Sequence, residues 1–153
     1  MSDPVVAAAQ SAFAQRLRDS SDVSDNTRNA QAIAKAWRTA VYELDPDRYQ
    51  IEVLVAPDLD QKIDVLDTET HTAYEFKVSG KNATGEFYKD IVKVIVWNRK
   101  RKRPIGKLVF VTEEEWGRKY PGQSHECQRR EPSKIVVYPQ GVTKGLFTAL
   151  GFV

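Results

Sequence analysis

Apolar residues recur at helical spacing in two stretches near the start of the chain. Residues 4–18 carry the first amphipathic pattern, and the polar segment 19–25 follows it. Within that segment Ser24 or Asp25 can cap a second helix, whose apolar stripe continues to about Leu44. The chain is therefore expected to open with two helices.

The spacing of apolar residues then changes to every second position, which is typical of strands. Three such segments are followed by a helix that is apolar over most of its circumference, and this predicts that the helix is buried. The expected elements are strands at Tyr49–Val55, Lys62–Leu66, Thr72–Val78, Lys107–Thr112 and Lys134–Tyr138, a loop at Pro57–Gln61, a helix from Thr84 to about Asn98, and short helices at Glu113–Tyr120 and Val142–Leu150.

The order helix, three strands, helix, strand predicts an α/β fold: a mixed β-sheet with an αβββαβ core and helices on both faces. With 153 residues, of which 41% are hydrophobic, the chain is long enough to bury a substantial core. We expect residues 1–25 to form an N-terminal helix and linker and residues 26–153 to form the main domain.

The composition indicates the cellular compartment in which the protein is expected. No run approaches the roughly 20 apolar residues of a membrane span, and the N-terminal segment lacks the basic start and apolar stretch of a signal peptide. The lone cysteine, Cys127, excludes an internal disulfide and favours a reducing environment. We therefore expect a cytoplasmic protein without a membrane partner.

Three charged residues interrupt the apolar strands at 62–66 and 72–78. If the hairpin closes on Glu69-Thr70, Asp64 lies directly opposite Glu75, with Lys77 on the same face of the strand. Two carboxylates at that separation repel each other unless a cation lies between them. A cluster of charges on a solvent-facing strand, neutralised by Lys77, is the structural alternative.

These residues and the order of elements resemble the PD-(D/E)XK nuclease superfamily, whose fold is restriction-endonuclease-like. The resemblance covers residues of about 26–112. It implies that Asp64, Glu75 and the backbone carbonyl of Phe76 bind Mg²⁺, for which Mn²⁺ can substitute. It also implies that Lys77 orients or deprotonates the attacking water.

Two further acids are candidates for this site. The literal Pro-Asp pair of the chain is Pro57-Asp58, so Asp58 is a reserve for Asp64, although it lies roughly 20 Å away along an extended strand. Relatives also carry an acid on the helix before the first strand. By that resemblance Glu43 is a further catalytic candidate, and exposure to water is its alternative.

Cations are concentrated after the motif. From Lys77 to Lys107 the chain has ten Lys or Arg residues against two acids, while the remainder has 13 basic and 19 acidic residues. Such a band suits a polyanion, although a solvated helix face with Lys89 and Lys93 paired to Glu86 or Asp90 is the alternative. The candidates for nucleic-acid binding are Lys81, Thr84, Lys89, Lys93, Arg99, Lys100, Arg101, Lys102 and Arg103.

The sequence therefore predicts a Mg²⁺-dependent endonuclease that acts on DNA rather than RNA, and a homodimer if it cuts both strands. The chain is small for a restriction enzyme, so a junction resolvase, a repair nuclease or a nuclease toxin is favoured. The alternative from another class is a non-catalytic nucleic-acid-binding or assembly module with the same fold. A further alternative is an α/β domain whose charged strand face has no function, and this alternative predicts no metal binding.

Overall fold

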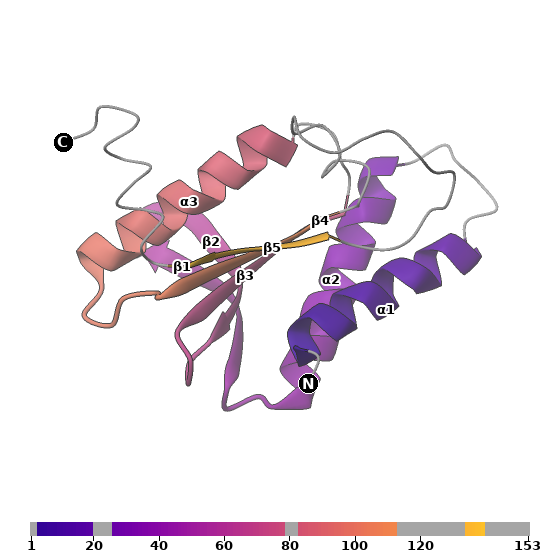
Figure 1. The fold of residues 1–153 in the computed structure, drawn as a ribbon, viewed down its shortest axis with the longest axis horizontal. Coiled ribbons are helices and arrows are strands. Elements are labelled where there is room, and N and C mark those ends of the chain that lie inside the picture. The colour runs from indigo at the N-terminus through magenta and orange to yellow at the C-terminus, as the bar shows by residue number, and fades with distance from the viewer. Residues whose placement is uncertain (1–2, 20–25, 79–82, 113–133, 140–153) are drawn as a thin grey trace.

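The computed structural model describes residues 3–19, 26–78, 83–112 and 134–139. Within them one sheet has the strand order β1-β2-β3-β4-β5; β3 and β4 run parallel and the other neighbours run antiparallel (Figure 1). The elements are the helices α1 (Pro4–Asp19), α2 (Asn26–Leu44) and α3 (Ala83–Lys100) and the strands β1 (Tyr49–Ala56), β2 (Leu59–Asp67), β3 (Thr72–Lys77), β4 (Lys107–Thr112) and β5 (Lys134–Pro139).

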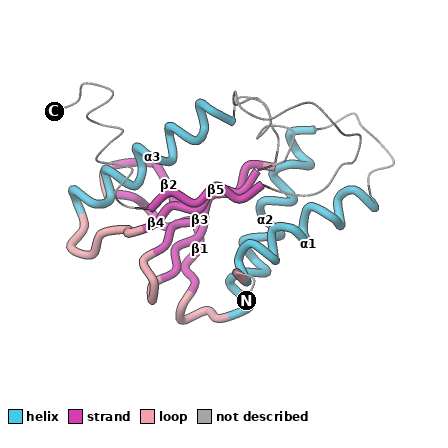
Figure 2. Tube along the Cα trace, viewed as in Figure 1, coloured by secondary structure: helices cyan, strands magenta, loops and turns pink. Residues whose placement is uncertain are grey.

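The predicted α/β architecture, a mixed sheet with helices on both faces, is confirmed. Figure 2 shows α3 on one side of the sheet and the pair α1 and α2 on the other. The prediction of a loop at Pro57–Gln61 is wrong, because β2 already begins at Leu59, which pairs with Ala56. Backbone pairing across the hairpin extends the strand through Asp60 and Gln61, although no apolar alternation marks them. The short helices expected at 113–120 and 142–150 lie outside the described residues, as do Ser24 and Asp25.

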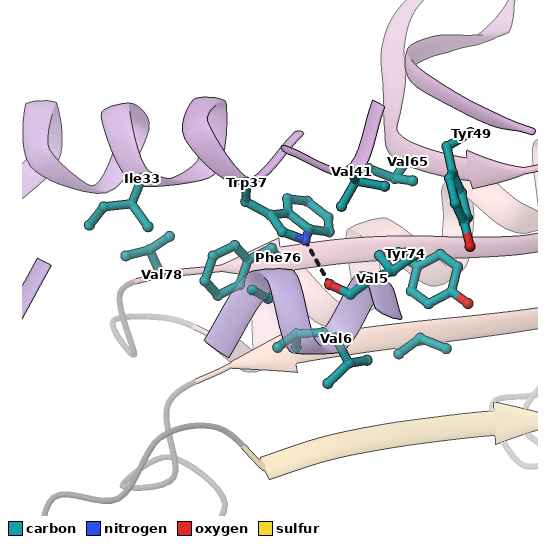
Figure 3. Packing of buried hydrophobic residues seen from close by; sticks show 13 residues of the cluster. Val5, Val6, Ile33, Trp37, Val41, Tyr49, Val65, Tyr74, Phe76 and Val78 are labelled. Atoms are coloured by element: carbon teal, nitrogen blue, oxygen red, sulfur yellow. Dashed lines mark hydrogen bonds between the residues drawn. The ribbon is translucent and has the colours of Figure 1, made fainter. Parts of the chain in front are cut away.

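One core layer joins α1 and α2 to the sheet (Figure 3). Trp37 of α2 is fully buried, its indole Nε1 donates a hydrogen bond of 3.0 Å to the carbonyl of Val5, and its ring meets Phe76 edge-on. Helix α1 therefore packs into the same core as α2. The layer also contains Val6, Ala9, Ile33, Val41, Tyr49, Val65, Tyr74, Val78, Val109 and Val111.

The second core layer lies between the sheet and α3. It contains Phe87, Ile91, Val94 and Trp97 of the helix, packed against strand residues that include Ile63, Leu66, Ala73, Leu108 and Phe110. The expectation that α3 is buried holds for this side of the helix. On its outer side, Tyr88 and Val92 are 46% and 55% exposed, because only one face of the helix rests on the sheet.

A change of face occurs in the middle of the β1–β2 hairpin. Ile51 and Val65 pack on the α1 and α2 side, whereas Val53 and Ile63, two residues away on each strand, pack on the α3 side. Residues i and i+2 of a regular strand point to the same face, so both strands rotate between these pairs. The rotation coincides with Glu52, which has a positive φ of 50°. It leaves Asp64 at the point where β2 turns from one layer to the other.

Candidate metal and nucleic-acid site

The β2–β3 hairpin has the register that the sequence predicts. Val65 pairs with Tyr74, and Asp67 pairs with Thr72. The next position along the ladder would set Asp64 against Glu75, but there the ladder gives way to a side-chain contact. The Phe76 amide donates a hydrogen bond of 3.3 Å to Asp64 Oδ2.

The same contact also determines where the Phe76 carbonyl points. The N–H and C=O groups of one strand residue point toward the same neighbouring strand. The carbonyl of Phe76 is therefore directed toward the side on which Asp64 lies. Strand geometry thus brings Asp64 beside the backbone of Phe76, the residue that follows Glu75.

Glu75 is the buried acid of this site. Only 4% of the residue is exposed, and Lys93 of α3 places its Nζ 3.1 Å from Glu75 Oε1. Burial, followed by the negative charges of Asp64 and Asp90, raises the pKa of Glu75 well above its ordinary value, and the charge of Lys93 opposes this. A cation of higher charge near this carboxylate would stabilise its ionised form.

Asp90 is a second buried acid, and the sequence analysis named it only as a possible surface partner of a lysine. Its Oδ1 lies 2.8 Å from Nζ of Lys93, one helical turn away, so Lys93 bridges Asp90 and Glu75. Burial lowers the pKa of Lys93, but the two carboxylates raise it by more, and the net pKa is raised. A signal was available: Asp90 falls on the same helical stripe as Phe87, Val94 and Trp97.

Lys77 lies two residues beyond Glu75 on β3, with its side chain 30% exposed. Its Nζ is 3.5 Å from Glu86 in the first turn of α3, and Glu86 also pairs with Lys89 at 2.9 Å. Hydrogen bonding from Lys89 is the largest cause that lowers the pKa of Glu86. Lys77 is thus adjacent to the acids but held by a carboxylate that sequence reasoning did not assign to the site.

Arg38 of α2 is a cation of the site that the sequence analysis did not name. Its guanidinium donates a hydrogen bond of 3.3 Å to Oδ1 of Asp64, whose side chain is 25% exposed. Glu43 was the candidate expected from this helix, but it is exposed on the last turn. Among the described residues, no hydrogen bond or ion pair joins Glu43 to Asp64 or Glu75. The residue of α2 that contacts the site is therefore the cation Arg38 and not the acid Glu43.

Asp58 is at the turn between β1 and β2, 67% exposed, where it pairs with Lys100 at 2.6 Å. The hydrogen bond from Lys100 lowers the pKa of Asp58. Asp64, in contrast, contacts the amide next to Glu75. Of the two candidate aspartates, Asp64 alone contacts the backbone of the Glu-x-Lys segment among the described residues.

The basic run at the end of α3, residues 99–103, is exposed, and it also supports the fold. The guanidinium of Arg101 lies 5.0 Å from the ring centre of Trp97 and donates to the backbone carbonyls of Leu54 and Val55. Together with the Lys100 pair, these contacts fasten the β1–β2 hairpin to the end of α3. Arg99, Lys102 and Arg103 have no side-chain ion pair among the described residues.

The remaining nucleic-acid candidates lie near the start of α3. Lys89 is 65% exposed and pairs with Glu86, whereas Lys93 points into the site. The helix begins at Ala83, one residue before Thr84, which was expected to cap it. Lys81 lies outside the described residues.

The donor set is compatible with a hard divalent cation. Within the part of the chain that the structure describes, no three His, Cys, Asp or Glu side chains are grouped closely enough to hold a metal ion. Mg²⁺, however, commonly takes one or two carboxylates and keeps several waters. Asp64, Glu75 and the Phe76 carbonyl are oxygen donors of the kind that such a site would use.

Comparisons with family models, with curated proteins and with solved structures found no match to this chain. Each helix in the described ranges is too short or too polar to cross a lipid bilayer.

Proposed function

We propose that this protein is a Mg²⁺-dependent nuclease with a restriction-endonuclease-like core, which hydrolyses phosphodiester bonds in DNA. The observation that carries the proposal is the meeting of Asp64 with the Glu75-Phe76-Lys77 segment where β2 and β3 part. Glu75 is only 4% exposed, and burying a carboxylate has a high electrostatic cost. Such burial is more typical of a functional position than of a solvated strand face.

The arrangement of elements adds support. The helix α2, the antiparallel strands β1, β2 and β3, the crossover helix α3 and the parallel strand β4 follow the αβββαβ order. The acids lie on the second and third strands of that unit, and Glu75 pairs with Lys93 of the crossover helix. This is the placement that the resemblance to PD-(D/E)XK nucleases implies for Asp64 and Glu75.

Each residue has a role in such a reaction. Asp64, Glu75 and the Phe76 carbonyl would hold the cation, which supplies an acidified water and neutralises charge on the phosphate. Lys77, 30% exposed beside the acids, would hold or accept the proton of the attacking water and stabilise charge at the phosphorus. The oxygen of water would replace the leaving oxygen on phosphorus directly, with no covalent link to the protein.

The substrate would approach along the basic end of α3. Arg99, Lys102 and Arg103 are exposed beside the fastened hairpin, and contacts from such side chains are to phosphates and carry no sequence information. One site cuts one strand, so cleavage of both strands would need a homodimer.

Cleavage of supercoiled plasmid and of a branched oligonucleotide, with Mg²⁺ or Mn²⁺ and with EDTA, tests the proposal. Asp64→Asn, Glu75→Gln and Lys77→Ala should abolish metal-dependent cutting. Asp58→Asn makes the same chemical change as Asp64→Asn at the exposed hairpin turn and should retain cutting. Equal loss in both aspartate variants, or cutting that persists in EDTA, would contradict the assignment.

One observation favours the non-catalytic alternative. Each acid of the site already has a cation within the protein: Asp64 has Arg38, and Glu75 has Lys93. A nucleic-acid-binding module would need no metal to keep this network neutral. Tight DNA binding in EDTA, with no cutting of either substrate in Mg²⁺ or Mn²⁺, would favour that function.

A further inference from the structure

Lys93 has a position that the proposed nuclease chemistry does not use. Its Nζ lies 3.1 Å from Glu75 Oε1 and 2.8 Å from Asp90 Oδ1, and its side chain is only 16% exposed. Among the described residues it is the only ion-pair partner of Glu75. The ammonium is thus paired with the carboxylate that a metal ion at this site would need.

We infer that Lys93 holds the cation position on Glu75 in the metal-free protein, and that Asp90 receives the ammonium when a divalent cation replaces it. The inference rests on the proposed function, because it concerns the same metal site. A lysine suits this role, since its ammonium is a compact charge on a flexible stem and can move without rearranging the backbone. The ammonium and the divalent cation repel each other, so they compete for the same carboxylate oxygen.

Asp90 makes the exchange feasible. It precedes Lys93 by three residues on α3, so the ammonium can stay on Asp90 after it leaves Glu75. Without this second acid, displacement would leave a buried ammonium unpaired, which is strongly unfavourable. Asp90 is therefore a positioning residue that acts through Lys93.

The ion pair between Arg38 and Asp64 is weaker than the ion pairs of Lys93. The contact between Arg38 and Asp64 is 3.3 Å long, and the Asp64 side chain is 25% exposed, so water screens the pair. Glu75 and Asp90 are both more than nine-tenths buried. Competition with a divalent cation is therefore expected mainly at Lys93.

The test is the affinity for Mn²⁺, measured by calorimetry and by electron paramagnetic resonance without nucleic acid, so that cleavage plays no part. Lys93→Met should bind Mn²⁺ at least about tenfold more tightly than the wild type, because the competing charge is gone. Asp90→Asn should bind it more weakly, because the ammonium then stays on Glu75. In the Lys93→Met background the effect of Asp90→Asn should be smaller, since the part that acts through Lys93 is absent.

Lys107→Met removes the same charge at the other end of β3, where Lys107 pairs with Thr72, and should leave Mn²⁺ affinity unchanged. If Lys93→Met does not fold, Lys93→Gln keeps a hydrogen-bond donor for both carboxylates and carries the test. Unchanged or weaker Mn²⁺ binding in the Lys93 variants, with binding and cutting by the wild type, would overturn this inference alone. Absence of Mn²⁺ binding in the wild type and in every variant would overturn the proposed function as well.

Discussion

Replacement of Asp90 by Asn tests whether the fold holds this acid at an energetic cost. The residue is 6% exposed, and its pKa is raised from 3.8 to about 6. Burial is the largest cause; Lys93 opposes it, and the charges of Asp64 and Glu86 add to it. The ion pair at 2.8 Å therefore does not fully compensate for desolvation.

The sign and size of the effect follow from proton linkage. Between about pH 3.8 and pH 6 the folded protein keeps a proton on Asp90 that the unfolded chain has released, so stability falls as pH rises through this window. Since a tenfold change in proton affinity corresponds to about 1.4 kcal/mol, the loss is roughly 3 kcal/mol over the window and roughly 2 kcal/mol between about pH 4.5 and pH 7.5. Asp90→Asn cannot titrate and lacks this loss.

Urea unfolding of wild type and Asp90→Asn in EDTA, at about pH 4.5 and about pH 7.5, measures the effect. The variant should gain roughly 2 kcal/mol relative to the wild type at the higher pH. Comparing the two pH values cancels the packing difference between Asp and Asn. A difference that is independent of pH, or a wild type that gains on the variant as pH rises, would refute the reasoning, because Lys93 would then outweigh burial.

Three further predictions concern the core, the hairpin turn and the basic surface. Trp37→Phe should lower the free energy of unfolding by about 1–3 kcal/mol in urea, because it removes the bond to the Val5 carbonyl and leaves a cavity; an unchanged value would show that α1 does not depend on this contact. Asp67→Ala should cost about 3 kcal/mol, since the acid is 1% exposed and accepts bonds from Arg48 and from the Glu69 and Thr70 amides; a loss below about 1 kcal/mol would contradict this. If the protein binds DNA as proposed, Lys102→Ala should reduce the log–log salt slope of binding by about one without changing stability, and the Asp58-paired Lys100 should contribute less; equal slopes in wild type and Lys102→Ala would remove Lys102 from the interface.

The helices, the strands and the faces of their residues could be predicted from the sequence, because the backbone alone sets the periods of helices and strands. Alternation along β3 placed Tyr74, Phe76 and Val78 on one face and Glu75 on the other, and the structure has this arrangement. The hairpin register follows from where the turn closes, so the sequence predicts Asp64 opposite Glu75. Helices α1, α2 and α3 were likewise predicted to within a few residues.

The partners of those acids depended on packing between elements distant in the chain. Arg38 reaches Asp64 because α2 rests on the sheet through Trp37, and Lys93 reaches Glu75 because α3 crosses the opposite face. No period in the sequence encodes which helix residue meets which strand residue. The rotation at Glu52, a non-glycine residue with φ of 50°, also had no local signal.

The sequence by itself determined which residues share a face, because strand and helix periods are properties of the backbone. It thereby placed an acid beside a Glu-x-Lys segment within apolar strands. Only the tertiary structure decided that α3 supplies Lys93 as the cation on Glu75, that Asp90 is buried beside it, and that Asp58 is at the hairpin turn. These outcomes depend on how the side chains of packed layers fit together, and that fit is a property of the whole fold.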